Sequence, residues 1–329
     1  MTFCLRRREL IAGLGGAAVA WPLASRAQQR GMPVVGYLEG GSPEPSRVVA
    51  FHKGLSETGY VEGRNVATEY RWAHNELDRL SELAADLVRR RVSVIAAPTT
   101  IEGALAAKAL NTTIPIVFGT TRDPVQSGLV ASLNRPGGNV TGFSNMLSQL
   151  GGKQLGLLHE LIPEAVRFAV LINPAGTTIE PYIRDVMAGA AAIGRQVEFF
   201  TASTNRDIDA AFASVAQKRA DAILVGPSPL FGNRRVQIVT LANYHRLPTM
   251  FNERDKVELG GLMSYGGSIT DLARQVGIYT GRILKGEKPA ELPVQLATKF
   301  EFIINLQTAR TLGIKVPPTL FALATEVIE

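Results

Sequence analysis

Short apolar runs rich in β-branched residues recur along the chain from Pro33 onward, separated by amphipathic stretches of roughly 12 to 18 residues with helical spacing. Eight of these runs have the length and composition of a β-strand. They are residues 34–38, 66–70, 94–97, 114–118, 168–172, 197–201, 222–225 and 248–251. Strands that alternate with helices in this way are typical of parallel sheets covered on both faces, so the pattern predicts an α/β fold.

The alternation falls into two blocks, which predicts two doubly wound parallel-sheet lobes. A stretch rich in Pro, Gly and Asn at 134–145 separates the blocks. Later in the chain the pattern predicts a helix over 269–284 and a strand pair near 296–304. This order favours lobes that share the chain through three crossovers over a simple tandem. We expect the first lobe to comprise residues 32–143 plus 262–288 and the second to comprise residues 144–250 plus 294–329.

The first 27 residues have the layout of a cleavable export signal. Arginines at 6–8 precede an apolar run at 10–23, and small residues lead to a predicted cleavage after Ala27. The paired arginines and the glycine-rich run are typical of the twin-arginine (Tat) route, although Arg6 stands where such signals usually have Ser or Thr. The run is too short and too rich in Gly and Pro for a membrane anchor. We therefore expect a periplasmic protein.

Removal of the signal changes both the charge and the cysteine content. Residues 1–27 carry four arginines and one glutamate, so their loss lowers the formal net charge from +6 to +3. No dense stripe of Lys and Arg remains, which argues against a nucleic-acid partner. The single cysteine, Cys4, is lost as well. The mature chain is therefore expected to have no disulfide, no thiolate metal site and no cysteine nucleophile.

The common catalytic signatures are missing from the sequence. The four histidines are scattered without HExxH spacing, and there is no G-x-S-x-G elbow, no P-loop and no G-x-G-x-x-G after a strand. We therefore expect a protein that is not an enzyme, with no catalytic residues, no metal and no cofactor.

Small polar residues follow several predicted strands, often with a proline directly after them. The clearest cases are Ser42–Pro43, Asp123–Pro124, Ser228–Pro229 and the variant Thr99–Thr100. In this pattern the polar residue caps a helix and proline takes its first position, which leaves free N–H groups at the carboxyl edge of the sheet. That edge binds ligands in open α/β folds, and helix N-termini favour anions. Capping alone explains each case, but the convergence of several such ends across a cleft favours a binding site.

Thirteen residues at or near these strand ends make up the predicted ligand site. They are Gly41, Ser42, Thr99, Thr100, Thr120, Thr121, Asp123, Asn173, Pro227, Ser228, Asn252, Glu253 and Tyr265. The stretch 118–130 combines hydroxyl donors and one carboxylate with no histidine nearby in the sequence. It therefore suits reversible capture of a ligand better than bond breaking.

Five segments together resemble one known family. They are "RRREL" with "SRAQ" at the start of the chain, "GYVEGRNV", "TTRDPVQSGLVASLNRPGGNVTG" and "LPVQLATKFEFIINLQTARTLGI". The family is the periplasmic substrate-binding proteins of ABC transporters that includes tryptophan- and tyrosine-binding members. The resemblance covers essentially the whole mature chain. It implies a type I periplasmic-binding-protein-like fold that closes over a small ligand and presents it to an ABC permease in the inner membrane, and it implies a monomer.

The resemblance also suggests roles for individual residues. In amino-acid-binding members, backbone amides and hydroxyls at the strand ends hold the ligand carboxylate, and an acidic residue meets the ammonium. The threonines at 99–100 and 120–121 match the first role, and Asp123 matches the second. Segments 136–141 and 289–293 and the region near Phe251 are the expected hinges.

The sequence therefore predicts an exported solute receptor for an ABC importer, with an amino acid, an aromatic one included, or a small aromatic carboxylate as ligand. Three alternatives stay open at this point. A sensor for a membrane signalling partner would share the same lobes. A ligand-responsive repressor would need a helix-turn-helix where this chain has its export signal. A periplasmic enzyme on the same fold would show turnover and a pair of titrating groups.

Overall fold

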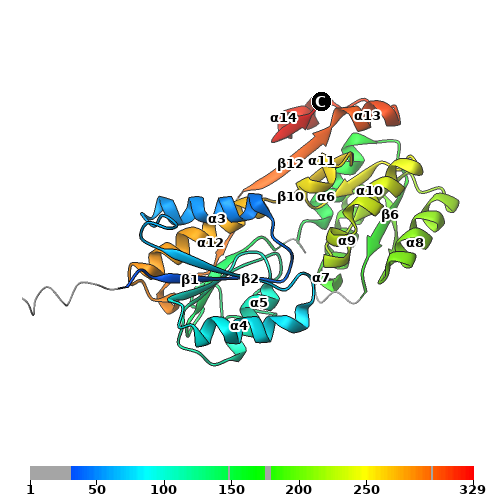
Figure 1. Ribbon diagram of the computed structural model, residues 1–329. Helices are drawn as coiled ribbons and strands as arrows, with labels where there is room; N and C mark the ends of the chain where they lie inside the picture. The colour runs from blue at the N-terminus through cyan, green and yellow to red at the C-terminus, as the bar shows by residue number, and fades with distance from the viewer. Residues whose placement is uncertain (1–30, 147–148, 175–178, 298) are drawn as a thin grey trace, which may run out of the picture.

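The computed structural model describes residues 31–146, 149–174, 179–297 and 299–329. The chain forms two lobes that lie side by side, each built on one β-sheet (Figure 1). The predicted export signal and Cys4 lie outside the described residues. Among the helices of the described part of the chain, none has the length and apolar character needed to cross a membrane.

The first lobe is built on a parallel sheet with the strand order β11-β5-β4-β3-β1-β2. Its strands are β1 (Val34–Glu39), β2 (Ala67–Trp72), β3 (Val94–Ala97), β4 (Ile116–Thr120), β5 (Val140–Ser144) and β11 (Gln295–Leu296). Helices α3 (Pro45–Glu57) and α12 (Ile269–Leu284) cover one face, and α4 (Leu80–Arg89) and α5 (Ile101–Ala109) cover the other. Two short 3-10 turns, at Leu77–Arg79 and Pro289–Glu291, complete the lobe.

The second lobe has the strand order β13-β12-β10-β9-β8-β6-β7, in which only the pairing of β10 with β12 is antiparallel. Its strands are β6 (Arg167–Ile172), β7 (Gln196–Thr201), β8 (Ala222–Val225), β9 (Thr249–Phe251), β10 (Met263–Gly267), β12 (Phe300–Asn305) and β13 (Glu326–Ile328).

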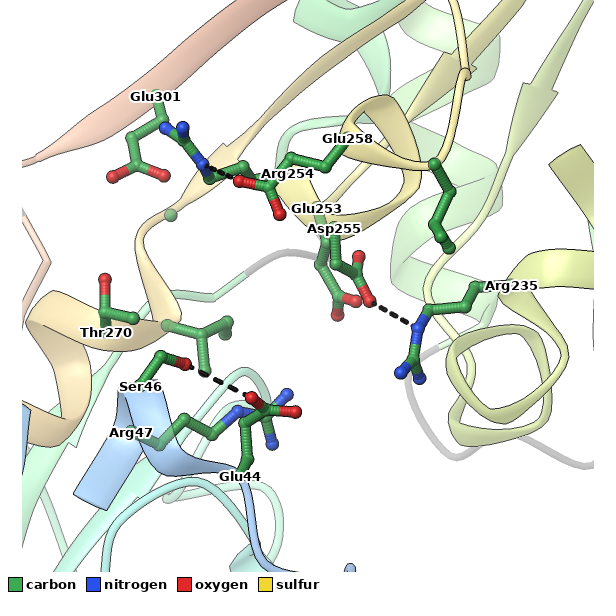
Figure 2. A pocket seen from close by; sticks show the side chains of 13 residues that line it. Glu44, Ser46, Arg47, Arg235, Glu253, Arg254, Asp255, Glu258, Thr270 and Glu301 are labelled. Carbon is green, nitrogen blue, oxygen red and sulfur yellow. Dashed lines mark hydrogen bonds and ion pairs between the residues drawn. The ribbon is translucent and has the colours of Figure 1, made fainter. Parts of the chain in front are cut away.

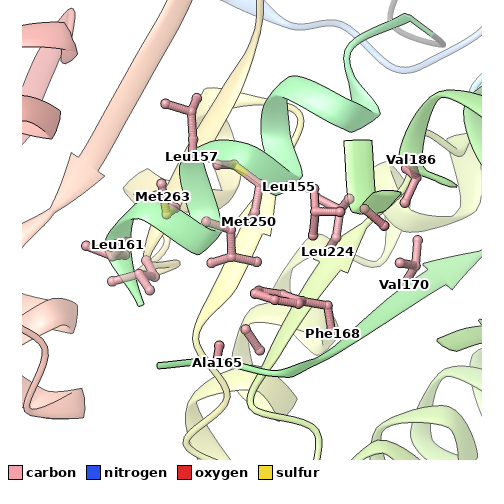
Figure 3. Close-up of a cluster of buried hydrophobic side chains, with 14 of the residues drawn as sticks. Leu155, Leu157, Leu161, Ala165, Phe168, Val170, Val186, Leu224, Met250 and Met263 are labelled. Carbon is pink, nitrogen blue, oxygen red and sulfur yellow. The ribbon is translucent and has the colours of Figure 1, made fainter. Parts of the chain in front are cut away.

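Helices cover both faces of the second sheet. The first face carries α6 (Gly151–Leu161), α7 (Ile179–Ile193), α13 (Leu306–Leu312) and α14 (Pro318–Leu323). The other carries α8 (Asn205–Gln217), α9 (Pro229–Asn233) and α10 (Arg235–Tyr244), and α11 (Arg254–Glu258) follows β9. On the first face Leu155, Phe168, Leu224 and Met250 are fully buried in one apolar cluster (Figure 3). Strands buried on both faces explain why the sequence shows continuous apolar runs there.

The predicted fold class is confirmed, but the expected lobe boundaries differ from the structure in two places. Residues 263–267 were expected in the first lobe, yet β10 pairs with β9 and β12 in the second sheet, where Met263 is fully buried. Residues 295–296 were expected in the second lobe, yet β11 pairs with β5 in the first sheet. The expected strand pair near 296–304 is therefore two strands of different sheets. The chain crosses between the lobes after β5, between β10 and α12, and between β11 and β12.

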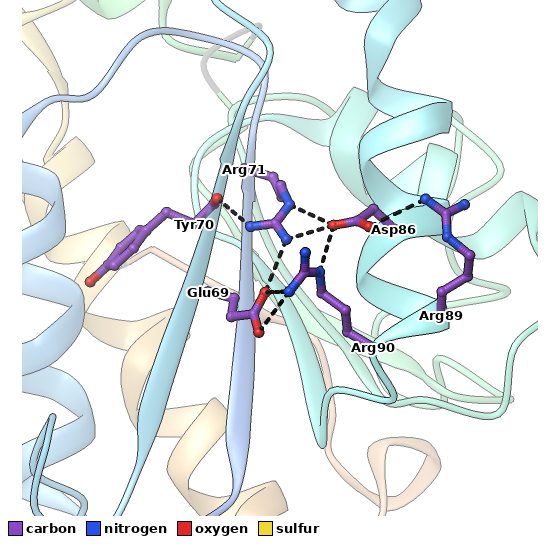
Figure 4. Close-up of polar contacts among 6 residues, drawn as sticks. All are labelled: Glu69, Tyr70, Arg71, Asp86, Arg89 and Arg90. Atoms are coloured by element: carbon purple, nitrogen blue, oxygen red, sulfur yellow. Dashed lines mark hydrogen bonds and ion pairs between the residues drawn. The ribbon is translucent and has the colours of Figure 1, made fainter.

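A group of charged side chains fixes the edge strand of the first sheet to the helix behind it (Figure 4). Arg71 on β2 donates from Nε to Oδ2 of Asp86 on α4 at 2.9 Å and from Nη2 to Glu69 at 2.9 Å. Arg90 donates to the same Asp86 oxygen at 2.9 Å. The hydrogen bond from Arg71, together with Arg90, lowers the pKa of Asp86 to about 2, so this carboxylate stays ionised down to strongly acidic pH.

Helices α3 and α12 approach each other so closely that glycines are required where they cross. A β-carbon on Gly277 would overlap the carbonyl oxygen of Phe51, and one on Gly54 would overlap the carbonyl oxygen of Arg274. Because these obstacles are backbone atoms, a side chain could be accommodated only if the helices moved apart. The close contact fixes α12, which arrives from the second lobe, to the first lobe.

We expect Gly277→Ala to destabilise the protein by about 1–3 kcal/mol, because overpacking forces backbone shifts. Gly156→Ala on α6 is the matched control, since a β-carbon there meets no atom within 4 Å and Ala favours a helix by about 0.5–1 kcal/mol over Gly. Thermal unfolding of both variants and the wild type checks this. A Gly277→Ala variant that unfolds at or above the wild-type temperature would contradict the required close approach.

Candidate functional site

A cavity of about 530 Å³ lies between the two lobes (Figure 2). The first lobe contributes the beginnings of α3 and α12, and the second contributes α11, the start of α10 and the strands β10 and β12. The lining residues are Glu44, Ser46, Arg47, Ile269 and Thr270 from the first lobe, and Arg235, Glu253, Arg254, Asp255, Glu258, Leu259, Gly267 and Glu301 from the second. The lining is therefore strongly charged and carries both signs.

The cationic side chains of the second lobe are paired within that lobe. Arg235 Nε lies 3.4 Å from Asp255 Oδ2. Arg254 contacts Glu258 at 2.6 Å and Glu326 at 2.7 Å. Figure 2 shows Arg235 and Arg254 across the cavity from Arg47. These ion pairs therefore lie within the second lobe and do not connect the two walls of the cavity.

Glu253 is an acidic residue of the cavity that is paired with a buried cation. The Lys256 ammonium, which is only 1% exposed, donates to Glu253 Oε2 at 2.6 Å and contacts Asp255 Oδ1 at 3.2 Å. The positive charge of Lys256 lowers the pKa of Glu253, and Arg47 and Arg235 act in the same direction against the effect of burial. Glu253 is therefore an anion at neutral pH, and Lys256 fixes its position.

Glu39, at the carboxyl end of β1, is a buried carboxylate that sequence reasoning missed. It is 4% exposed and accepts three hydrogen bonds, from Thr99 N at 2.7 Å, Thr99 Oγ1 at 3.0 Å and Thr100 Oγ1 at 2.6 Å. Burial raises its pKa despite these donors and the nearby Arg47. An acid that directly follows the apolar run "VVGYL" was the available signal, but a lone Glu in a sequence reads as a surface residue.

Glu39 also changes the predicted role of the threonine pair. Thr100 is the N-cap residue of α5, as expected, but its side chain makes no capping hydrogen bond. Its hydroxyl and that of Thr99 donate to Glu39 instead. Arg47 Nη1 lies 3.5 Å from Thr99 Oγ1, so the buried carboxylate is linked through Thr99 to a residue of the cavity.

Two of the expected Ser/Asp–Pro helix starts are not helix starts. Helix α3 begins at Pro45 with Glu44 as its N-cap residue, and exposed Ser42 lies 3.3 Å from His74 Nδ1. Asp123 precedes a turn, where its Oδ1 accepts hydrogen bonds from Val125 N at 2.8 Å and from the next amide at 3.1 Å. Asp123 therefore satisfies the backbone of its own turn, as Asp next to proline often does, whereas the partner of Ser42 comes from a distant part of the chain.

The other predicted residues lie at strand ends, as expected, except Tyr265, which lies in the middle of β10. Only Glu253 of the whole predicted set lines the cavity. Ser228 is the N-cap residue of α9, and its hydroxyl accepts from Asn173 Nδ2 at 3.1 Å instead of capping the helix. Tyr265 on β10 stacks on Phe300 at 5.8 Å between ring centroids. The remaining members, which do not line the cavity, are Gly41, Thr120, Thr121, Pro227 and Asn252.

Within the described residues, no group of three or more His, Cys, Asp or Glu side chains is arranged to hold a metal ion. What the site offers is a fixed anion at Glu253, arginines from both lobes and a buried acid behind Thr99. This arrangement can bind a small polar molecule that carries charges of both signs.

Comparison with known proteins agrees with this geometry. Residues 34–328 match the family model described as ABC transporter substrate binding protein. A tyrosine-binding protein of Clostridioides difficile (strain R20291) is 28% identical over 265 residues, which make up 80% of this chain and 76% of the relative.

Two solved structures have closely similar folds. A conserved domain protein from Vibrio cholerae has a TM-score of 0.80 at 27% identity, with 90% of this chain and 100% of that chain covered. An ABC domain from Streptococcus pneumonia in complex with L-Trp has a TM-score of 0.80 at 24% identity, with 91% and 100% covered. The chain belongs to the ABC transporter substrate-binding protein family, and the predicted type I periplasmic binding fold is confirmed.

The buried carboxylate of Glu39 leads to a prediction about pH. Its pKa in the folded protein is raised above the ordinary 4.5, so its contribution to stability is fully present below pH 4.5 and is lost as the pH rises through the raised value. We expect the melting temperature of Glu39→Gln, relative to wild type, to increase as the pH rises from 4.5 to 8. Thermal unfolding over this range measures the difference.

A second variant removes one of the hydrogen-bond donors to Glu39 and tests the same pH dependence. Thr100→Val removes the hydroxyl that lowers the pKa of Glu39, so its stability should fall more steeply with pH than that of the wild type. If the melting temperatures of all three proteins change with pH by the same amount, the raised pKa is wrongly assigned to Glu39.

Proposed function

We propose that the protein is the exported receptor of an ABC importer, which binds an amino acid between its lobes and delivers it to a permease in the inner membrane. The segment 1–27 acts as the export signal, by the twin-arginine route, and the mature protein works in the periplasm as a monomer. Membership of the substrate-binding family supports the role of receptor. The tyrosine-binding relative and the structural neighbour with L-Trp support an amino acid as ligand, including an aromatic one.

The observation that carries the proposal is the cavity of about 530 Å³ whose walls come from both lobes and carry both signs of charge. An α-amino acid is a small zwitterion, so it needs an anion and a cation or dipole within a few ångströms of each other. A site shared between lobes also gives binding a mechanical consequence. Ligand contacts to both walls favour the conformation in which the walls are close, and the hinge equilibrium shifts toward it.

Within this site we assign the ligand ammonium to Glu253 instead of Asp123. Glu253 lines the cavity, and Lys256 holds it ionised in one position. Asp123 does not line the cavity, and its Oδ1 serves two backbone amides of its own turn. A carboxylate that satisfies its own turn has little left to offer a ligand.

The first test is a thermal-shift screen of the protein, unfolded and refolded to remove carried-over ligand, against amino acids, aromatic acids, nucleosides and sugars. A ligand at about 100 times its dissociation constant should add about 2.7 kcal/mol of stability, which raises the melting temperature by a few degrees. We expect shifts with amino acids, with tryptophan, tyrosine and phenylalanine among the candidates. Shifts with sugars or nucleosides alone would overturn the amino-acid ligand while leaving a receptor.

The role of Glu253 is tested by comparing an amino acid with its deaminated acid. The wild type should prefer the amino acid, and Glu253→Gln should lose roughly tenfold to a hundredfold of that preference, the range for a hydrogen bond to a charged group. The ratio of the two affinities is compared because it cancels any general loss of stability that follows when Lys256 is left unpaired. Asp123→Ala is the control and should keep the preference. Equal preference in Glu253→Gln and wild type by titration calorimetry would exclude Glu253 as the ammonium partner.

A further inference from the structure

The carboxylate of an amino-acid ligand needs a binding place other than the Thr99–Thr100 pair. Both hydroxyls and the Thr99 N–H already donate to Glu39, so they have no hydrogen left for a second carboxylate. The edge formed by β1 and β3 is therefore unsuited to an anion. A different element at the cavity must supply free hydrogen-bond donors.

Asn145, at the crossing that follows β5, carries an amide group that makes no hydrogen bond within the part of the chain that the structure describes. Its backbone N–H donates to Thr120 O at 2.9 Å, which fixes the residue at the carboxyl edge of the first sheet. Its side chain is 4% exposed, and neither Oδ1 nor Nδ2 has a partner among the described residues. Buried polar groups without a partner are rare in native proteins, and each calls for a specific explanation.

The Asn145 amide lies against a residue of the cavity wall. A β-carbon on Gly267 would lie 2.6 Å from both Cγ and Nδ2 of Asn145, so the amide packs against the Gly267 backbone. Gly267 itself lines the cavity. Because this residue has no side chain, the Asn145 amide fills the space beside the cavity wall that a side chain at 267 would take.

The N-terminus of α12 begins at the same place. Ser268 is its N-cap residue, and Ile269 and Thr270, the first two residues of the helix, line the cavity. The Ser268 hydroxyl accepts from Asp271 N at 3.2 Å, whereas the N–H groups of the first two residues have no acceptor within the helix. Asp271, the acid of this first turn, is paired with Arg274 at 3.0 Å. Free N–H groups and the helix dipole favour an anion at this point.

A second asparagine flanks the crossing from the other lobe. Asn252 follows β9, is 4% exposed, and its side chain takes part in none of the hydrogen bonds of the described residues. Its backbone packs against Gly266, just as Asn145 packs against Gly267. The next residue along the chain is Glu253, to which we assign the ammonium. The two ends of an α-amino acid would therefore lie close together, as its covalent structure demands.

We propose that the ligand carboxylate binds at the N-terminus of α12, where it accepts hydrogen bonds from the Asn145 amide and from the first N–H groups of the helix. This assignment rests on the proposed amino-acid receptor function and names the part of the site that selects a carboxylate. Asn252 lies on the opposite side of the crossing, where its amide can complete the contact from the second lobe.

The experiment measures by titration calorimetry the binding of L-tyrosine, 3-(4-hydroxyphenyl)propanoate, which lacks the ammonium, and L-tyrosinamide, which lacks the carboxylate charge. Wild type and Asn145→Ala are compared. The variant should bind the two carboxylates about tenfold or more weaker and should bind the carboxamide with little change. Asn145→Asp, which places a negative charge at the same point, should reverse the preference between tyrosine and tyrosinamide.

Asn139 supplies a matched control, because it flanks the same strand as Asn145. It lies at the opposite end of β5, where its Nδ2 donates to Thr112 O at 2.9 Å and to Ile114 O at 2.6 Å. Asn139→Ala should lower the melting temperature and leave the ligand preference unchanged. Asn145→Ala should leave the melting temperature nearly unchanged and should alter the ligand preference, because its amide has no partner to lose among the described residues.

The outcomes separate this inference from the proposed function. If the wild type prefers tyrosine to both analogues and Asn145→Ala keeps the same ratios, the carboxylate position is wrong and the receptor function stands. If the wild type binds the deaminated acid as tightly as tyrosine and Asn145→Ala weakens both, the carboxylate position stands and the ammonium assignment fails. If the wild type binds none of the three, the aromatic amino-acid ligand and this inference both fail.

Discussion

The close passage of the chain between the lobes at Gly266 and Gly267 is the constraint on which the rest of the site depends. A β-carbon on Gly266 would overlap the carbonyl oxygen of Asn252, and one on Gly267 would overlap the side chain of Asn145. Two consecutive residues without side chains allow β10 to leave the second sheet and continue directly into α12 of the first lobe. The carboxyl edges of the two sheets therefore meet at one point, and the start of α12 lies at the cavity because of it.

Buried charge is the second feature that shapes the site. Glu39 in the first lobe and Lys256 in the second are almost fully buried, although removing a charge from water is costly. Each is offset by fixed local partners, the threonine donors for Glu39 and the two acids of α11 for Lys256. These partners hold the surrounding side chains in place before any ligand arrives. Such preorganisation reduces the ordering cost that a ligand would otherwise have to offset.

The sequence predicted the architecture well because the signals for it are local. Runs such as 94–97 and 222–225 are apolar on both sides, which identifies buried parallel strands, and the periodicity of 269–284 matches α12 at both ends. The lobe boundaries were predicted wrongly where a strand pairs with a part of the chain that is distant in sequence. Nothing local shows that 263–267 joins the second sheet while 295–296 joins the first, because each short segment takes its partner from a distant part of the chain.

The site was less predictable than the fold for a related physical reason. Ser, Thr and Asp at strand ends were predicted to bind the ligand, but Ser42, Thr99 and Asp123 use their polar atoms on the protein itself. Whether a polar group is free is a property of its three-dimensional neighbours. Asn145, whose amide has no hydrogen-bond partner among the described residues, and Glu39, which is buried, could not be distinguished in the sequence from ordinary surface residues.

The distribution of charge pairs also bears on how the lobes close. The ion pairs of Arg235, Arg254 and Lys256 lie within the second lobe, and Arg47 faces them from the first. Charges already satisfied within one lobe gain little when the lobes approach, so they give a weak drive to close without ligand. A zwitterion between the walls adds contacts to both lobes at once. The difference between the affinities of the ligand for the closed and open forms sets how far the equilibrium shifts. The fraction of closed molecules therefore follows the fraction that has ligand bound.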